Sequence, residues 1–207
     1  MSLWIKICGL SDQEMIDASI EAGADAIGFV LDRSPREVSL EQACALKEFT
    51  AGRCEIVAVM RQASPDKIRS ICADLQPDWI QANAPVNMDS ASLQGARRLP
   101  VVRGQLPAGI NIPDGRCLYE GAESGIGQLA DWSAARKLAR SANLVLAGGL
   151  TPQNVSDAVR SVRPFGVDVS SGVETSPGRK DPGKIHQFIS AARQAHAALN
   201  ARETVNE

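Results

Sequence analysis

The sequence predicts a single α/β domain, a (β/α)8 TIM barrel that spans residues 1–207. Two observations carry this prediction. Short β-rich runs alternate with longer amphipathic runs, which is typical of a parallel sheet covered by helices. The 207 residues also suit one buried core, and no linker or low-complexity stretch divides them. Eight expected strands favour a closed barrel over an open doubly wound sheet, because closure leaves no unpaired edge.

The expected elements follow one another in order along the chain. Strands are expected at residues 3–8, 26–31, 55–60, 79–82, 101–103, 116–120, 144–147 and 167–169. Helices are expected at residues 12–22, 40–49, 65–74, 91–97, 132–141, 152–159 and 182–199. Oxygen-bearing side chains that could cap helix starts are Ser11, Ser64, Asp131, Thr151 and Asp181. The connection at residues 104–115 holds three glycines and two prolines, so we expect a loop there instead of a fifth crossover helix.

The composition excludes several classes of function. Aromatic residues make up 4% of the chain, the net charge is −2, and Lys and Arg are scattered, so we expect no nucleic-acid partner. No apolar run is long enough to cross a bilayer, and the first residues lack the features of a signal peptide. The five cysteines show no CxxC or Cys/His spacing. We therefore expect a cytoplasmic protein with reduced thiols, no metal and no membrane partner.

Active sites of barrels lie at the carboxyl ends of the strands, so those positions are the first candidates. Cys8 ends the first expected strand and Glu120 ends the sixth. A cysteine in an apolar run is most often a small buried hydrophobe, and a carboxylate next to a loop is often only a solvated charge. At the rim, Cys8 could instead act as a base or nucleophile if a cation or dipole lowered its pKa, and Glu120 could act as an acid opposite it.

Three loops at the same rim offer anion-binding groups. Arg36 follows the second strand, where it is either a surface arginine or a guanidinium that grips a planar carboxylate with two hydrogen bonds. Gly148 and Gly149 follow the seventh strand, and Ser170 and Ser171 follow the eighth. In barrels these two loops commonly bind phosphate, because glycines expose backbone N–H groups. The alternative is that both loops are ordinary turns.

Five motifs, taken in order, resemble the phosphoribosylanthranilate isomerase family of the tryptophan pathway. They are KICGL at residues 6–10, GADAIGFV at 23–30, SPR at 34–36, LAGGLTPQNV at 146–155 and GVDVSSGVE at 166–174. The resemblance covers nearly the whole chain. It implies a barrel that catalyses the Amadori rearrangement of N-(5-phosphoribosyl)anthranilate to 1-(2-carboxyphenylamino)-1-deoxyribulose 5-phosphate by general acid/base catalysis and without a cofactor.

The resemblance also implies roles for individual residues. Cys8 matches the general base that removes the C2 proton, Arg36 matches the residue that holds the anthranilate carboxylate, and Asp168 matches a carboxylate that faces the substrate. The phosphate-binding positions are matched by Gly148, Gly149, Ser170 and Ser171. The expected partner is thus a small phosphoribosyl substrate, and the protein could be a monomer or a homodimer.

Three departures from the family pattern lie on one side of the expected barrel. The sixth strand ends Leu-Tyr-Glu at residues 118–120, where the family has Leu-Leu-Asp with the aspartate as general acid. The extra methylene of Glu120 moves the carboxyl group by roughly an ångström, which can cost on the order of a hundredfold in rate. Asn83 stands where the family carries a histidine, and the loop at residues 124–127 lacks a glycine and a hydroxyl residue of the usual pattern.

Three functions therefore stay open at the level of sequence. The first is a working phosphoribosylanthranilate isomerase in which Glu120 is the acid. The second is a paralogous isomerase for a different phosphoribosyl amine, whose aglycone is still acidic because Arg36 is retained. The third is a non-catalytic barrel that binds a phosphate-bearing ligand or serves as a scaffold.

Overall fold

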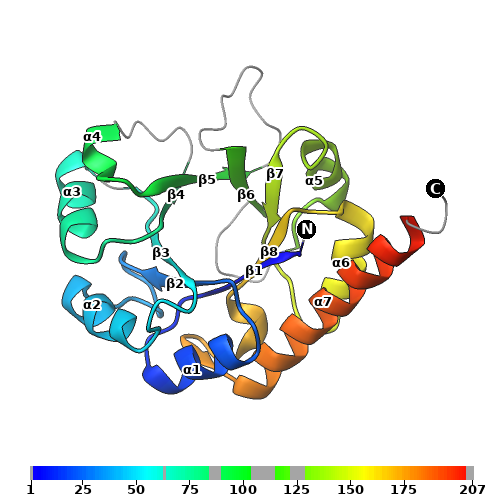
Figure 1. Cartoon of the computed structure of the whole chain (residues 1–207), viewed down its shortest axis with the longest axis horizontal. Coiled ribbons are helices and arrows are strands. Elements are labelled where there is room, and N and C mark those ends of the chain that lie inside the picture. Colours follow the sequence, from blue (N-terminus) through cyan, green and yellow to red (C-terminus); the bar gives the residue numbers. More distant parts are fainter. Residues whose placement is uncertain (1, 63, 84–89, 104–114, 122–128, 204–207) are drawn as a thin grey trace.

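The computed structural model describes residues 2–62, 64–83, 90–103, 115–121 and 129–203, and in these residues eight parallel strands form a closed barrel (Figure 1). Each strand pairs with its neighbour in sequence, and β8 pairs with β1 to close the ring. The strands are β1 (Trp4–Cys8), β2 (Ala26–Val30), β3 (Glu55–Val59), β4 (Trp79–Asn83), β5 (Arg97–Arg103), β6 (Arg116–Glu120), β7 (Asn143–Leu146) and β8 (Gly166–Val169). The predicted (β/α)8 barrel is confirmed.

The helices cover the outside of this ring (Figure 1). They are α1 (Gln13–Glu21), α2 (Leu40–Glu48), α3 (Pro65–Asp74), α4 (Ser90–Leu93), α5 (Trp132–Leu138), α6 (Val155–Val162) and α7 (Pro182–Glu203). After β8 the chain forms a short 3-10 helix, η2 (Ser171–Val173), and a hairpin of β9 (Glu174–Ser176) and β10 (Arg179–Lys180). The loop expected between β5 and β6 lies almost entirely outside the described residues.

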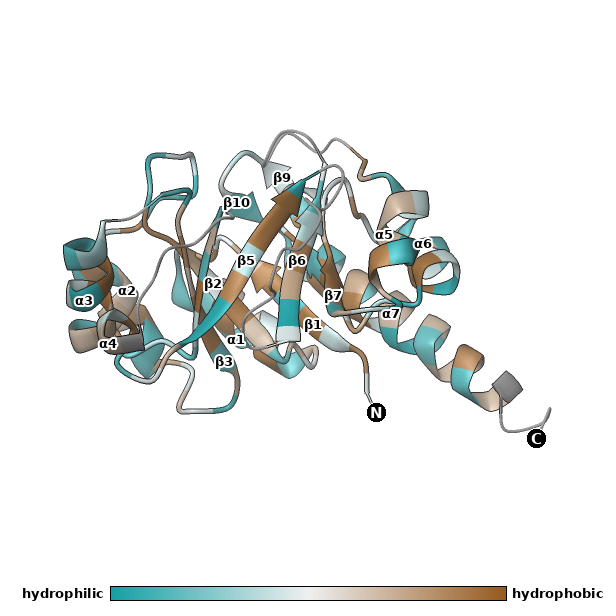
Figure 2. Ribbon diagram, turned by 90° about the horizontal axis from the view of Figure 1, so that it is seen from above, coloured by the Kyte–Doolittle hydropathy of each residue, from teal (hydrophilic) through white to brown (hydrophobic). Residues whose placement is uncertain are grey.

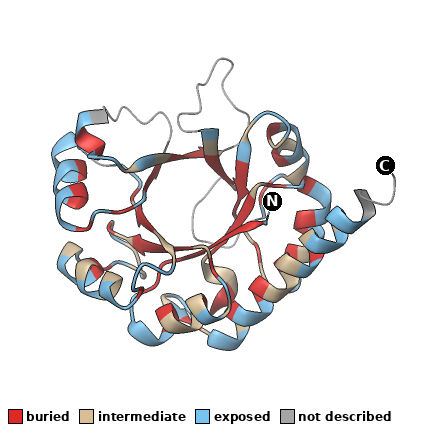
Figure 3. Ribbon diagram, in the orientation of Figure 1, coloured by how far each residue is buried: buried red, intermediate tan, exposed pale blue. Residues whose placement is uncertain are grey.

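The alternation of side chains along the strands creates two apolar layers. Outward-pointing residues such as Ile5, Ile27 and Ile80 belong to the layer between strands and helices. Inward-pointing residues fill the barrel itself and form a second cluster of Trp4, Ala26, Val57, Trp79, Leu99, Val101, Leu118, Val145 and Ala147. The strands are hydrophobic over much of their length, and the helices are exposed mainly on their outer sides (Figures 2 and 3).

The amino-terminal end of the barrel is filled by an arginine among aromatic rings. The guanidinium carbon of Arg116 lies 4.2 Å from the ring centroid of Trp79, 4.4 Å from that of Phe165 and 4.7 Å from that of Trp4. Burial lowers the pKa of Arg116, although the nearby carboxylate of Glu55 opposes that effect. Because these groups fill the amino-terminal end, the cavity of the barrel opens at the carboxyl ends of the strands.

Several predicted helix starts are confirmed and two are wrong. Ser64, Asp131 and Asp181 accept backbone N–H groups of the first turns of α3, α5 and α7. The cap of α1 is Asp12 instead of Ser11, since the Asp12 carboxylate accepts the Met15 N–H at 2.9 Å.

The start of α6 and the end of α4 also differ from the predictions. The Thr151 N–H donates to the Asn154 side chain, so the turn at residues 151–154 precedes α6, which begins at Val155. The expected helix at residues 91–97 ends at Leu93, because Gln94 and Gly95 have positive φ angles of 47° and 99°. Arg97 then begins β5 by pairing with Trp79.

The five cysteines are free thiols. In the part of the chain that the structure describes, no helix combines the length and the apolarity required to cross a membrane. The same residues contain no cluster of three or more His, Cys, Asp or Glu side chains arranged to hold a metal ion.

Candidate active site

A cavity of about 670 Å³ opens at the carboxyl ends of the strands. Its volume lies in the range of small-molecule sites. The predicted site residues in its wall are Cys8, Arg36, Glu120, Asp168, Ser170 and Ser171. The structure therefore brings together side chains from β1, β6, β8 and the loops after β2 and β8.

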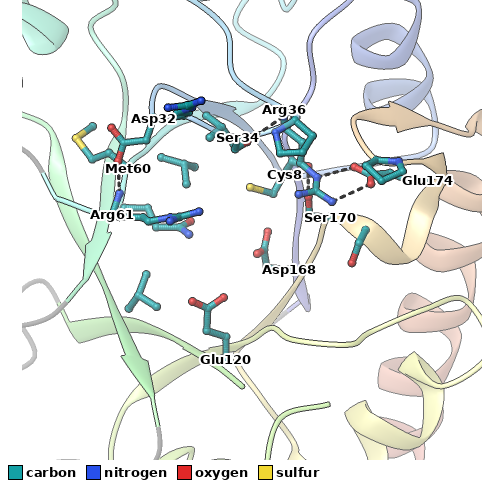
Figure 4. Close-up of a pocket in the computed structure, with 18 of the residues that line it drawn as sticks. Cys8, Asp32, Ser34, Arg36, Met60, Arg61, Glu120, Asp168, Ser170 and Glu174 are labelled. Atoms are coloured by element: carbon teal, nitrogen blue, oxygen red, sulfur yellow. Dashed lines mark hydrogen bonds and ion pairs between the residues drawn. The ribbon is translucent and has the colours of Figure 1, made fainter. Parts of the chain in front are cut away.

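Cys8 and Glu120 extend into the cavity from opposite sides, with Asp168 between them in the view of Figure 4. Cys8 ends β1 and Glu120 ends β6, so the two side chains reach the same rim from opposite parts of the ring. The sequence predicted this opposition of a thiol and a carboxyl group. It is the spatial requirement for a base and an acid that act on two atoms of one substrate.

The thiol of Cys8 is buried, with 6% of the residue exposed. Burial raises the pKa of this thiol. The charge of the Lys6 ammonium group is the strongest effect that lowers the pKa, but it does not fully offset the effect of burial. This direction is opposite to the lowered pKa that the sequence argument requires for Cys8. A Cβ on Gly28 of β2 would lie 3.1 Å from both the Cys8 Sγ and the Lys6 Cε, so glycine gives these two side chains room to lie together.

Lys6 is a site residue that sequence reasoning missed. It is completely buried, and its Nζ lies 2.8 Å from the Asp168 Oδ1. Burial alone would lower the pKa of Lys6, but the charges of Asp168 and Cys8 outweigh it, so the pKa is raised and the ammonium group stays charged. A signal was present, because a lysine two positions before Cys8 on a strand shares its inward face.

Arg36 lies beside Cys8 in the cavity wall and is held by a buried carboxylate (Figure 4). Its Nε and Nη2 donate to the two carboxylate oxygens of Glu174 at 2.7 Å and 2.9 Å, and the Lys180 Nζ donates to the same carboxylate at 2.7 Å. Burial would raise the pKa of Glu174, but the hydrogen bonds and charges of Arg36 and Lys180 keep it below its ordinary value. A ligand carboxylate would therefore meet the Nη1 side of the guanidinium, since Glu174 occupies the Nε side.

The loops after β7 and β8 contact each other closely. A Cβ on Gly172 would lie 1.8 Å from the carbonyl oxygen of Leu150, so only glycine permits this approach. The Ser170 hydroxyl donates to the carbonyl oxygen of Cys8 at 3.0 Å, and the Lys180 Nζ donates to the Ser170 carbonyl at 3.0 Å. Ser170 is thus fixed between the Cys8 backbone and a buried cation. Gly148 and Gly149, the predicted glycines of the loop after β7, are not among the residues that line the cavity.

Three further polar side chains in the wall come from β4 and β5. Arg103 donates through Nη1 to the Asn83 Oδ1 at 2.8 Å and through Nη2 to the Glu120 Oε1. The Oε1 of Gln81 is buried and, among the described residues, has no hydrogen-bond partner. A buried acceptor without a partner is costly, so Gln81 is suited to receive a donor from a ligand.

An eight-stranded barrel with a thiol and a carboxyl group on opposite sides of one cavity has the architecture of an acid–base barrel enzyme. The chain belongs to the N-(5'-phosphoribosyl)anthranilate isomerase family, since the model described as N-(5'phosphoribosyl)anthranilate (PRA) isomerase matches residues 5–191. The family resemblance drawn from the sequence motifs is confirmed.

Individual relatives agree with this assignment. The N-(5'-phosphoribosyl)anthranilate isomerase of Natronomonas pharaonis is 35% identical over 201 residues, which cover 91% of this chain and 97% of that protein. The crystal structure of phosphoribosyl anthranilate isomerase from Thermotoga maritima has a TM-score of 0.81 at 30% identity and covers 93% of this chain and 99% of its own. A similar structure holds reduced 1-(o-carboxyphenylamino)-1-deoxyribulose 5-phosphate, with a TM-score of 0.77, 30% identity and the same coverage.

Proposed function

We propose that this chain catalyses the Amadori rearrangement of N-(5-phosphoribosyl)anthranilate to 1-(2-carboxyphenylamino)-1-deoxyribulose 5-phosphate in tryptophan biosynthesis. Cys8 is the general base and Glu120 is the general acid. The observation that supports this most strongly is their placement on opposite sides of one cavity (Figure 4). A furanose between them can offer its ring oxygen to Glu120 and its C2 hydrogen to Cys8.

The reaction then needs two proton transfers in sequence. Glu120 protonates the furanose oxygen, the bond from that oxygen to C1 breaks, and the nitrogen lone pair forms a protonated Schiff base with C1. The thiolate of Cys8 removes the proton from C2, and the electron pair of that bond forms the enolamine. Ketonisation, with proton uptake at C1 and proton loss from the C2 hydroxyl, gives the product. Substrate and product are isomers, so no oxidant or reductant is consumed.

The least favourable requirement of this scheme is the ionisation of Cys8 to the thiolate. Because burial raises the pKa of Cys8, only a small part of the thiol is ionised near neutral pH. Lys6 is the main group that favours the thiolate, and Lys180 adds a weaker effect of the same sign. The charges of Lys6 and Lys180 thus both favour the thiolate form of Cys8.

The remaining site residues hold the two ends of the substrate. Arg36 takes the anthranilate carboxylate, with Glu174 fixing the plane of its guanidinium. Asp168 faces the sugar, held in place by Lys6. The phosphate binds at the paired loops through Gly148, Gly149, Ser170 and Ser171. The cytoplasmic location and the choice between monomer and homodimer stay predictions.

The experiment is the conversion of freshly generated phosphoribosylanthranilate by the purified protein, followed through the loss of anthranilate-type fluorescence. Turnover supports the proposal. Absence of turnover, together with a thermal shift on addition of the reduced product analogue, indicates a non-catalytic barrel. Turnover only of other phosphoribosyl amines indicates the paralogous isomerase.

A further inference from the structure

Two positions at which the sequence departs from the family pattern meet at one side chain. Asn83 ends β4 and Glu120 ends β6, and Arg103, the last residue of β5, contacts both. Its Nη1 donates to the Asn83 Oδ1 at 2.8 Å, and its Nη2 donates to the Glu120 Oε1. The departures at positions 83 and 120 are therefore physically connected.

The register of the barrel explains this arrangement. β5 lies between β4 and β6, Arg103 pairs with Glu120 across β5 and β6, and Asn83 pairs with Val101 across β4 and β5. Residues 101 and 103 point to the same face of β5, so the Arg103 side chain reaches the carboxyl ends of both neighbours. All three polar side chains lie in the cavity wall.

We propose that Arg103 is a positioning residue for Glu120, an inference that rests on the proposed function. Glutamate has one more rotatable bond than aspartate, so its carboxyl group can occupy more positions. The Arg103 guanidinium is planar and its donors have a fixed geometry. Because Asn83 holds it at Nη1, the bond from its Nη2 restricts the positions that the Glu120 carboxyl group can occupy. Misplacing a catalytic group by about 1 Å can cost on the order of a hundredfold in rate, so this restriction matters for catalysis.

Asn83 holds the Arg103 guanidinium in place. Its amide oxygen is a neutral acceptor that keeps the same character at every pH, and it binds the Arg103 Nη1. A histidine in its place would offer one acceptor nitrogen when neutral and none when protonated. A protonated histidine would also repel the guanidinium. Asparagine at position 83 and the longer carboxylate at position 120 are thus two parts of one adaptation to Arg103.

The test is steady-state kinetics on phosphoribosylanthranilate with Arg103→Met, Arg103→Lys and Asn83→Ala. Arg103→Met should lower kcat roughly tenfold to a hundredfold, because the acid is misplaced, while KM stays within about twofold. Arg103→Lys should recover only part of the loss, because lysine keeps the charge but lacks the planar fork. Asn83→Ala should lower kcat by a smaller factor, and it should have no further effect in the Arg103→Met background.

Arg97→Met is the matched control. Arg97 lies at the opposite end of the same strand, where it pairs with Glu55, so its loss should leave kcat and KM unchanged. Affinity for inorganic phosphate, measured by calorimetry, shows whether each variant keeps a folded site, because the proposed function assigns phosphate to the loops after β7 and β8 and not to Arg103. If Arg103→Met does not fold, Arg103→Lys and Asn83→Ala carry the test.

Two results would overturn the inference while leaving the proposed function intact. One is a raised KM with unchanged kcat in the Arg103 variants, which would make Arg103 a substrate-binding residue. The other is unchanged kinetics in all three variants of a parent protein that does turn over the substrate. A parent protein without turnover would overturn the proposed function, and this inference with it.

Discussion

The Lys6 Nζ lies 2.8 Å from the Asp168 Oδ1 in the interior of the barrel, beneath the thiol of Cys8. A fully buried ammonium group requires a partner, because the cost of removing a charge from water is large. Asp168 supplies that partner and keeps Lys6 charged next to the Cys8 thiol. The two charges act on the thiol in opposite directions, since Lys6 lowers the pKa of Cys8 and Asp168 raises it.

The first prediction concerns the ionisation of Cys8. Because burial raises its pKa above the ordinary value of 9.0, alkylation by iodoacetamide should increase with pH and pass its midpoint above 9. Lys6→Met removes the cation that favours the thiolate, so the midpoint should move higher still and the rate at pH 8 should fall. Peptide mass spectrometry measures this rate for Cys8, with Cys44 and Cys54 as internal references. Equal profiles for the parent and Lys6→Met would contradict the role of Lys6.

A second prediction concerns stability and Glu174. The pKa of this carboxyl group is lower in the folded protein than its ordinary value of 4.5, so its ion pairs add stability above that pH and lose it as the pH falls. Glu174→Gln should lower the free energy of unfolding by about 3 kcal/mol at pH 7, because Arg36 and Lys180 stay buried without their anion. Urea unfolding at several pH values should show a constant difference above the ordinary value of 4.5 and a shrinking difference as the pH falls below it. A difference independent of pH would contradict the ion-pair account.

Glu120→Asp restores the residue that the family usually carries, yet we predict that it lowers activity. The shorter side chain withdraws the carboxyl group by roughly an ångström from the Arg103 guanidinium that holds it, which should reduce kcat about tenfold or more. Steady-state kinetics of the variant beside the parent measures this. A variant faster than the parent would show that the longer carboxylate is a defect instead of part of an adaptation.

Gln81 supplies a prediction that separates stability from binding. Its buried Oε1 has no partner among the described residues, and such a group costs about 1–3 kcal/mol. Gln81→Leu should therefore leave the melting temperature of the free protein unchanged or raise it, while KM rises roughly tenfold through the loss of a bond to substrate. Differential scanning fluorimetry and kinetics on the same samples measure both. A lower melting temperature with unchanged KM would assign Gln81 a purely structural role.

Much of the fold could be read from the sequence, because hydrophobic periodicity and turn residues are local signals. The sixth strand was predicted with its observed bounds, Arg116–Glu120, and the third helix with its bounds, Pro65–Asp74. The predicted end of the fourth helix was wrong, because residues 94 and 95 adopt positive φ angles. The amphipathic pattern of residues 91–97 does not reveal these angles. Local propensity was overruled there by the pairing of β5 with β4.

The site was predictable only where strand position alone was sufficient. Cys8 and Glu120 each end a strand, so their meeting in one cavity follows from barrel geometry. The pairings of Lys6 with Asp168, Arg36 with Glu174 and Arg103 with Asn83 join residues 162, 138 and 20 positions apart. Such pairings depend on register and side-chain direction, which one sequence does not contain. The catalytic and binding roles of these residues stay predictions until they are measured.

The most direct test of the acid–base account is the turnover of phosphoribosylanthranilate by the parent, by Cys8→Ala and by Glu120→Ala under identical conditions. The account predicts measurable turnover by the parent and a loss of roughly a hundredfold or more in each variant, because each removes one of the two proton-transfer groups. The double variant should be little slower than either single variant, because the two groups act on one reaction path. A parent that turns over the substrate and an equally active Cys8→Ala would contradict the account.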